Sequence, residues 1–299
     1  MELPAPTTVA LKVDVDTFIG TRDGIPKLLN TLQQFGIRAT FYFSLGPDNS
    51  GKAIRRIVKK GFLSKMLRTR APSMYGLRTM LYGTLLPPPR IGALLPDVIR
   101  SVRQAGHEVG IHCWDHVKWH DYLGRFTKQA VAEELNSSAG MFEKIFGFPA
   151  RTTAAPGWTV SADSLEIQDS MRLAYSSDSR GTAPFFPVMD GRRFTTLQIP
   201  STWPTMDELL GENGITLDTI NDQYLAFLKP GLNVHTIHAE LEGNALNSTF
   251  IDLLTRLSAH NVRFITLAEA AEEFAVHAPE CSLKMGAIAG RAMPVALQG

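Results

Sequence analysis

The chain has 299 residues, of which 44% are hydrophobic and 20% are charged, and its formal net charge is +1. This composition excludes a disordered chain and predicts an ordinary globular protein that buries a full core. Two cysteines, Cys113 and Cys281, exclude a disulfide scaffold, and without a secretory leader or an apolar run of about 18 residues we expect a cytoplasmic protein with no spanning helix.

The first predicted elements form a strand–helix–strand unit. Residues 8–14 (TVALKVD) indicate a short buried strand that ends in acid, and residues 38–44 (RATFYFS) are rich in the aromatic and β-branched residues of strands. Between them, apolar residues at helical spacing predict a helix over residues 22–35, which Gly36 ends. Two strands joined in this way run parallel, with a right-handed crossover.

An insertion interrupts this alternation at residues 51–96. The segment contains ten Lys or Arg residues and no Asp or Glu, and many of its other residues are apolar or aromatic. This composition is typical of a helical element that lies on a membrane surface. Two other interpretations stay open, namely a helical insertion that packs on the body with its charges in water, and a nucleic-acid patch. The apolar content favours lipid over nucleic acid.

After the insertion, helices and strands alternate again to the end of a single domain, which we place at residues 1–277. Residues 278–299 are small and irregular in pattern, so we expect an irregular tail. Thr127 is a suitable N-cap and Gly147 a suitable stop for a long helix between them, and Ser161 can cap the next one. The predicted helices cover residues 94–104, 127–146, 161–173, 206–210, 217–228, 248–260 and 267–276, and the predicted strands cover residues 107–112, 152–158, 174–178, 196–200, 233–238 and 262–266.

Two histidines four residues apart, His112 and His116, are the first candidates for chemistry. On a helical turn this spacing puts both imidazoles on one face, where they suit two neighbouring positions around a divalent cation. A polar helix start whose histidines share a face by chance is the simpler alternative. His120 continues the spacing, and we expect it at the surface. A metal site needs a further ligand, usually a carboxylate, from elsewhere in the chain.

Acidic residues and another histidine lie at the ends of other predicted strands. Asp14 and Asp16 follow the first strand, Asp178 ends the strand that begins at residue 174, and His238 ends a later one. Each alone is explained as a turn, cap or strand-end residue. Together with the histidine pair they place reactive groups at the carboxyl ends of four strands, as on the catalytic face of a βα barrel.

Six phrases carry these residues: VDVDTF (13–18), SLGPDN (44–49), HCWDH (112–116), APGW (155–158), SDSRG (177–181) and TIHAELEG (236–243). In this order they resemble the motifs of the NodB-homology polysaccharide deacetylases, and most closely those of the ArnD-type deformylases. The resemblance covers about residues 11–273. It implies an α/β fold, a distorted (β/α) barrel of the NodB type, with the basic helical insertion after its second strand.

The resemblance also implies roles for the residues at the strand ends. A divalent metal (zinc, cobalt, manganese or nickel) would be the cofactor. Its ligands would be Asp16, His112 and His116. The catalytic residues would be Asp14 as general base, His238 as general acid, and Asp178 as the carboxylate that orients and charges a histidine.

One departure from the family concerns the cation that holds the base. Many deacetylases have an arginine for this purpose in the segment that matches residues 154–158, and this sequence has none there. We expect Arg180 to supply the cation instead. Trp158, Arg180 and Glu240 are the predicted substrate contacts, because they stand beside catalytic motifs.

The implied reaction is metal-dependent hydrolysis of the formamide of undecaprenyl-phosphate-linked 4-deoxy-4-formamido-L-arabinose. It would release formate and leave the 4-amino-4-deoxy-L-arabinose lipid that modifies lipid A in cationic-peptide resistance. The protein would lie peripherally on the cytoplasmic face of the inner membrane, docked on anionic lipid by residues 51–96, with no nucleic-acid partner.

Two alternative functions remain in view. The first is deacetylation of another N-acylated amino sugar, of the peptidoglycan or chitin type, and the missing secretory leader argues against it. The second is a non-catalytic, membrane-associated sugar-binding protein, and the intact set of acids and histidines argues against that.

Overall fold

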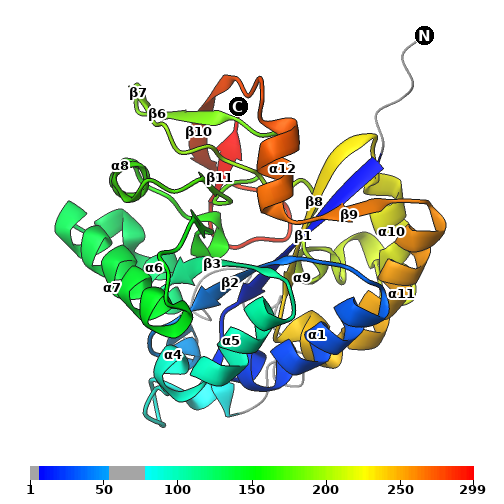
Figure 1. Ribbon diagram of the computed structural model, residues 1–299, viewed down its shortest axis with the longest axis horizontal. Helices are drawn as coiled ribbons and strands as arrows, with labels where there is room; N and C mark the ends of the chain where they lie inside the picture. The colour runs from blue at the N-terminus through cyan, green and yellow to red at the C-terminus, as the bar shows by residue number, and fades with distance from the viewer. Residues whose placement is uncertain (1–6, 54–77) are drawn as a thin grey trace.

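The computed structural model describes residues 7–53 and 78–299, and at its centre is a sheet built around β1 (Thr7–Val15) (Figure 1). The other strands of this sheet are β2 (Thr40–Ser44), β3 (Glu108–Cys113), β4 (Thr152–Thr153), β5 (Tyr175–Ser176), β8 (Gly231–His238) and β9 (Arg263–Ile265). Their order is β5-β4-β3-β2-β1-β8, and β9 also pairs with β1. Every pair in the sheet is parallel, as the alternating pattern predicts.

An extended segment, residues 197–203, closes this sheet. On one side the amide of Ser176 in β5 donates to the carbonyl of Leu197 over 2.7 Å. On the other side the amide of Thr202 donates to the carbonyl of Val234 in β8 over 3.0 Å. The two outer strands are thereby joined, and the architecture is the expected distorted (β/α) barrel.

Helices cover the outside of the barrel (Figure 1). Apolar residues on the inner faces of α1 and α11, such as Leu28 and Leu253, are fully buried in the main core with Leu11 and Val13 of β1. Burying such a leucine contributes about 2 kcal/mol, so these faces fix the helices on the sheet. The helices are α1 (Ile25–Gln34), α4 (Ile91–Leu94), α5 (Pro96–Gln104), α6 (His116–Tyr122), α7 (Lys128–Phe146), α8 (Ala162–Met171), α9 (Met206–Leu209), α10 (Ile220–Phe227), α11 (Asn247–Ala259) and α12 (Leu267–Phe274).

The ends of α7 and α8 follow from the residues that flank them. The side chain of Thr127 accepts the amide of Ala130 at the start of α7, and Gly147 ends the helix with φ 79°, a left-handed conformation that glycine adopts without strain. Ser161 caps α8 reciprocally with Ser164. The predicted caps are therefore confirmed.

The prediction of an irregular tail at residues 278–299 is wrong. The tail forms β10 (Glu280–Gly286) and β11 (Val295–Gln298), which join β6 (Phe186–Met189) and β7 (Arg192–Arg193) in a four-stranded sheet of order β11-β10-β6-β7 (Figure 1). The reason is that Leu283, Val295 and Ala296 are almost completely buried in this sheet. The apolar residues of the tail are too few to predict strands alone, and they are stabilised by a partner sheet.

Much of the predicted basic insertion, residues 54–77, lies outside the described residues. Its described end contains a short 3₁₀ turn, Thr79–Leu81, and α4. Leu85 and Leu94 are 81% and 60% exposed there, and Arg78 and Arg90 are exposed near them. Within the described part of the chain, no helix is long and apolar enough to cross a membrane.

Candidate active site

Three side chains converge at the carboxyl end of the sheet: Asp16 directly after β1, His112 in β3, and His116 at the start of α6. One ligand atom from each lies within 4.8 Å of the other two. Nε2 of His112 is 3.1 Å from Oδ1 of Asp16, and Nε2 of His116 is 3.3 Å from Oδ2. One carboxylate with two imidazoles leaves coordination positions open, as catalytic metal sites require.

The atoms of this cluster fit a divalent cation. Oδ1 of Asp16 is buried and has no hydrogen-bond partner among the described residues, although an imidazole nitrogen is close. Burial alone would raise the pKa of Asp16, but the charges of His116 and His112 outweigh it and hold this pKa well below its usual range. A carboxylate that stays ionised between two imidazoles suits zinc, cobalt, manganese or nickel.

The two histidines reach the cluster from a strand, as the predicted strand at residues 107–112 implies, and from a helix, so they do not share the helical turn that their spacing alone suggests. His112 is inside β3, and His116 is the first residue of α6. Asp115 between them caps α6, because its Oδ1 accepts the amide of Lys118 over 3.0 Å. Asn49, from the SLGPDN phrase, donates to Oδ2 of Asp115 over 2.6 Å. The turn between β3 and α6 leaves the two imidazole centroids 5.3 Å apart.

His120 is buried, which corrects the expectation of a surface residue. It is 7% exposed, and its ring stacks on that of His116 with centroids 6.2 Å apart and an interplanar angle of 11°. The backbone at Gly157 passes so close that a Cβ there would collide with the His120 ring. The APGW phrase therefore packs directly behind the metal cluster.

The predicted base and acid lie side by side on neighbouring strands. Asp14 of β1 is directly opposite His238 of β8 in the parallel register. The strands β1 and β8 end at the same edge of the sheet, where Asp16 also lies. The structure thus brings together five of the predicted site residues: Asp14, Asp16, His112, His116 and His238.

Lys12 is the cation beside the base. Its side chain is 0% exposed, and its Nζ is 3.2 Å from Oδ2 of Asp14. The ammonium also lies 5.1 Å from the ring centroid of Trp158 and 5.9 Å from that of Tyr42. The expectation that Arg180 holds the base is therefore wrong. The sequence indicates this contact, because Lys12 and Asp14 are residues i and i+2 of one strand and therefore point to the same face.

Carboxylates other than Asp178 surround His238. Burial alone would lower the pKa of His238, but the charges of Asp16, Asp207 and Glu242 raise it above its ordinary value. The amide of His238 donates to Oε2 of Glu242 over 2.8 Å, and burial raises the pKa of Glu242 to about 7.

Asp178 is placed differently from its predicted role. It is fully buried, and its carboxylate accepts from Nε2 of Gln198 over 3.2 Å. Burial raises its pKa, and the charge of Lys12 opposes that rise. Asp178 thus feels the charge of Lys12, and no hydrogen bond joins it to a histidine among the described residues.

The three predicted substrate contacts are largely buried. Glu240 is 2% exposed, and its Oε2 is 3.5 Å from the amide of Asp16. Burial and the charge of Asp16 raise the pKa of Glu240 well above its usual range. Trp158 is 2% exposed, has φ 53°, and donates from Nε1 to Ser201 over 3.1 Å. Arg180 retains 12% side-chain exposure. Arg180 is the most exposed of the three.

Sequence reasoning missed two residues that meet Arg180. Glu208 of α9 accepts from Nη1 of Arg180 over 2.9 Å and from Nη1 of Arg291 over 3.0 Å. Both guanidiniums lie over the ring of Trp158, at 4.9 and 4.7 Å. Arg291 comes from the tail that was expected to be irregular, so no motif pointed to it.

A family model described as polysaccharide deacetylase matches residues 4–176, more than half of the chain. A relative from Shewanella sediminis (strain HAW-EB3) is 39% identical over 264 residues, which are 88% of this chain and 85% of the relative. The chain belongs to the polysaccharide deacetylase family. The Shewanella relative is assigned as 4-deoxy-4-formamido-L-arabinose-phosphoundecaprenol deformylase ArnD. A relative from Wigglesworthia glossinidia brevipalpis with the same assignment is 32% identical over 276 residues, covering 91% of this chain and 96% of the relative.

Solved structures of deacetylases share the fold. A Mycobacterium smegmatis protein assigned as a polysaccharide deacetylase has a TM-score of 0.63 at 16% identity, covering 96% of this chain and 98% of that one. Peptidoglycan deacetylase PdaC from Bacillus subtilis has a TM-score of 0.51 at 15% identity, covering 91% and 93%. These likenesses establish the deacetylase barrel as the fold of this chain.

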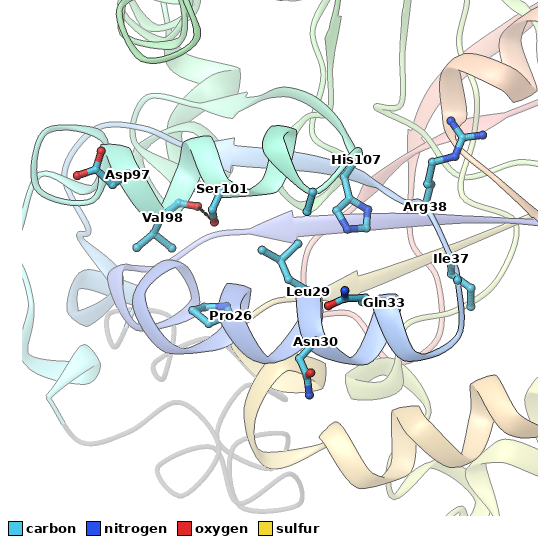
Figure 2. Close-up of a pocket in the computed structure, with 12 residues that line it drawn as sticks. Pro26, Leu29, Asn30, Gln33, Ile37, Arg38, Asp97, Val98, Ser101 and His107 are labelled. Carbon is cyan, nitrogen blue, oxygen red and sulfur yellow. Dashed lines mark hydrogen bonds between the residues drawn. The ribbon is translucent and has the colours of Figure 1, made fainter.

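A pocket of about 780 Å³ lies apart from the residues above, between α1 and α5 (Figure 2). Leu29 and Val98 face it from the two helices, and Arg38 and His107, which precede β2 and β3, line its other end. It therefore opens at the amino ends of the strands, whereas the deacetylase cluster is at their carboxyl ends. None of the predicted catalytic or metal-binding residues lines it.

Proposed function

We propose that this protein hydrolyses the formamide of undecaprenyl-phosphate-linked 4-deoxy-4-formamido-L-arabinose, releasing formate and leaving the 4-amino-4-deoxy-L-arabinose lipid used to modify lipid A. The observation that carries the proposal is the Asp16, His112 and His116 cluster beside the in-register pair Asp14 and His238. The assignments of two relatives that align over most of the chain support this substrate. The enzyme is accordingly a hydrolase of a carbon–nitrogen amide bond.

A divalent metal held by the cluster would polarise the formamide carbonyl and make water a stronger nucleophile at neutral pH. Asp14 accepts the proton that the attacking water loses. Lys12, buried against Oδ2 of Asp14, holds this carboxylate in place and compensates its charge. Trp158 and Tyr42 confine the ammonium from two other directions.

His238 donates the proton that the leaving amine needs. The negative charges around it favour its imidazolium form, which is the form that can act as an acid. Because His238 is opposite Asp14 in the register, the two proton transfers occur on neighbouring strands. Asp178, which is buried and feels the charge of Lys12, has a supporting role at the base in this scheme.

The substrate lipid places the enzyme at a membrane. In our proposal the protein is peripheral on the cytoplasmic face of the inner membrane, and the basic segment at residues 51–96 docks on anionic lipid, each Lys or Arg near the surface adding about 1 kcal/mol. The exposed Leu85, Leu94, Arg78 and Arg90 at its described end support this orientation.

Formate release tests the function. Metal-loaded protein is incubated with the formamido-arabinose lipid in detergent and, separately, with acetylated chitin and peptidoglycan oligosaccharides. We expect formate from the first and no acetate from the others. His112→Ala should abolish both formate release and bound metal, whereas His277→Ala, an exposed histidine, should change neither. Acetate without formate would instead identify a deacetylase of polymeric amino sugars.

A further inference from the structure

We propose that Arg180 and Arg291, held together by Glu208 and Trp158, form the site that binds the phosphodiester of the lipid-linked substrate. The inference rests on the proposed function and adds to it the group that recognises the phosphate. The two arginines come from different parts of the fold, since Arg180 follows β5 and Arg291 lies between the tail strands β10 and β11.

Buried contacts fix the two guanidiniums in one place. The side chain of Glu208 is 2% exposed and accepts from Nη1 of both arginines. The ring of Trp158 lies 4.9 Å from Arg180 and 4.7 Å from Arg291. The backbone supports this arrangement, because the amide of Arg180 donates to Ala296 of β11 over 2.8 Å. The side chains therefore lose little freedom when they bind a ligand.

The cluster has unused capacity for an anion. Two guanidiniums share one carboxylate, which leaves an excess of one positive charge, and a phosphodiester carries one negative charge. Among the described residues, the two guanidiniums donate hydrogen bonds through Nη1 alone. Their side chains remain 12% and 15% exposed, and each guanidinium is a planar fork of N–H donors that matches two phosphate oxygens.

Contacts through Trp158 link the arginine cluster to the reacting centre. Trp158 contacts Lys12, which contacts Asp14, and the adjacent Gly157 packs on His120, whose ring stacks on His116. In a sugar with a formamide at C4 and a phosphate at C1, the formyl carbon and the phosphorus are about 7 Å apart, a few covalent bonds of about 1.5 Å. In our proposal, a substrate whose formamide meets Asp14 places its phosphate at the arginine pair.

The test compares two soluble substrates that differ only in this charge. One is formamido-arabinose joined to a short alkyl chain through a phosphodiester, and the other is the neutral alkyl glycoside. We expect the wild-type enzyme to prefer the phosphodiester in kcat/KM by tenfold or more, mainly through KM. Arg291→Gln and Arg180→Gln should each bring that ratio close to one, and Arg291→Lys should retain part of it. Arg193→Gln, an exposed arginine of β7, should leave the ratio unchanged.

Other outcomes would overturn the inference. If Arg291→Gln lowers turnover of both substrates equally, the arginine only anchors the tail. If it leaves the ratio intact and weakens binding to phosphatidylglycerol vesicles, the cluster binds membrane headgroups. A wild-type enzyme that deformylates both substrates without preference refutes the phosphate site and leaves the proposed function standing. Release of formate from neither substrate refutes the function itself.

Discussion

Two sets of cations lie against Trp158, and they are built in opposite ways. Lys12 belongs to the central strand, is completely buried, and faces the carboxylate of Asp14. Arg180 and Arg291 come from a loop and the tail, keep some exposure, and share Glu208. In our proposals, the buried cation matched one-to-one compensates the carboxylate of Asp14, whereas the partly exposed pair with excess charge is available to a ligand.

The largest expected effect comes from removing the buried cation. Lys12→Met leaves the carboxylate of Asp14 without its partner in a buried site, a situation that costs about 3–5 kcal/mol. We expect kcat to fall about a thousandfold, equivalent to about 4 kcal/mol, with KM and bound metal little changed. Steady-state kinetics and metal analysis measure this.

The conservative variant Lys12→Arg should retain part of kcat. Lys284→Met, at an exposed strand residue, should have no effect. A Lys12→Met enzyme with normal kcat would show that this cation has only a packing role.

The next prediction concerns Glu208, the carboxylate that accepts hydrogen bonds from both arginines. Glu208→Gln leaves two guanidiniums together without their shared partner, so we expect the free energy of unfolding to fall by about 3 kcal/mol in urea denaturation. Glu166→Gln is the matched control, because Glu166 also accepts from two cations, Lys128 and Arg192, but is exposed. Its loss should cost much less, because solvent screens an exposed ion pair. Equal effects of the two variants would contradict a buried, organised arginine pair.

A smaller effect concerns His235, which Arg180 helps to keep neutral. Burial first, and then the charges of Arg180 and His238, lower the pKa of His235 to about 3. In the unfolded chain this histidine has a pKa near 6.5, so as the pH falls the unfolded chain takes up a proton before the folded protein does. The stability contributed by neutral His235 is therefore complete above about pH 6.5 and is lost as the pH falls towards 3.

His235→Phe should remove this dependence. Both ring nitrogens lack hydrogen-bond partners among the described residues, and the ring packs on Trp203 and Tyr224, so phenylalanine fits the site. Relative to the wild type, the variant should gain about 2 kcal/mol between pH 6.5 and pH 5. Urea unfolding across that range measures it, and parallel stability curves would refute the neutral buried histidine.

Sequence patterns predicted which acids and histidines of this site lie together. Parallel strands end at one edge, so Asp16, His112 and His238 could be placed together from strand order alone, and caps such as Thr127 gave helix ends. The i and i+2 spacing of Lys12 and Asp14 also indicates that Lys12 is the cation beside Asp14.

The arginine half could not be predicted in the same way. Glu208 and Arg291 are brought together by tertiary packing of α9 on the tail, with Gly290 at φ 77° where a Cβ would lie 2.6 Å from the carbonyl of Glu208. No local period encodes such a contact. The tail strands likewise depend on β6 as a partner, and their own pattern is too short to show it.

The in-register pairing of Asp14 with His238 also bears on how the protein acquires activity. β1 pairs with β2, its near neighbour in the chain, and with β8, which follows more than two hundred residues later. Contacts of such long sequence separation form slowly, because a large loop must close first. The proposed base and acid therefore meet only when this long-range strand pairing is complete, and recovery of turnover after dilution from denaturant should lag behind recovery of helix content.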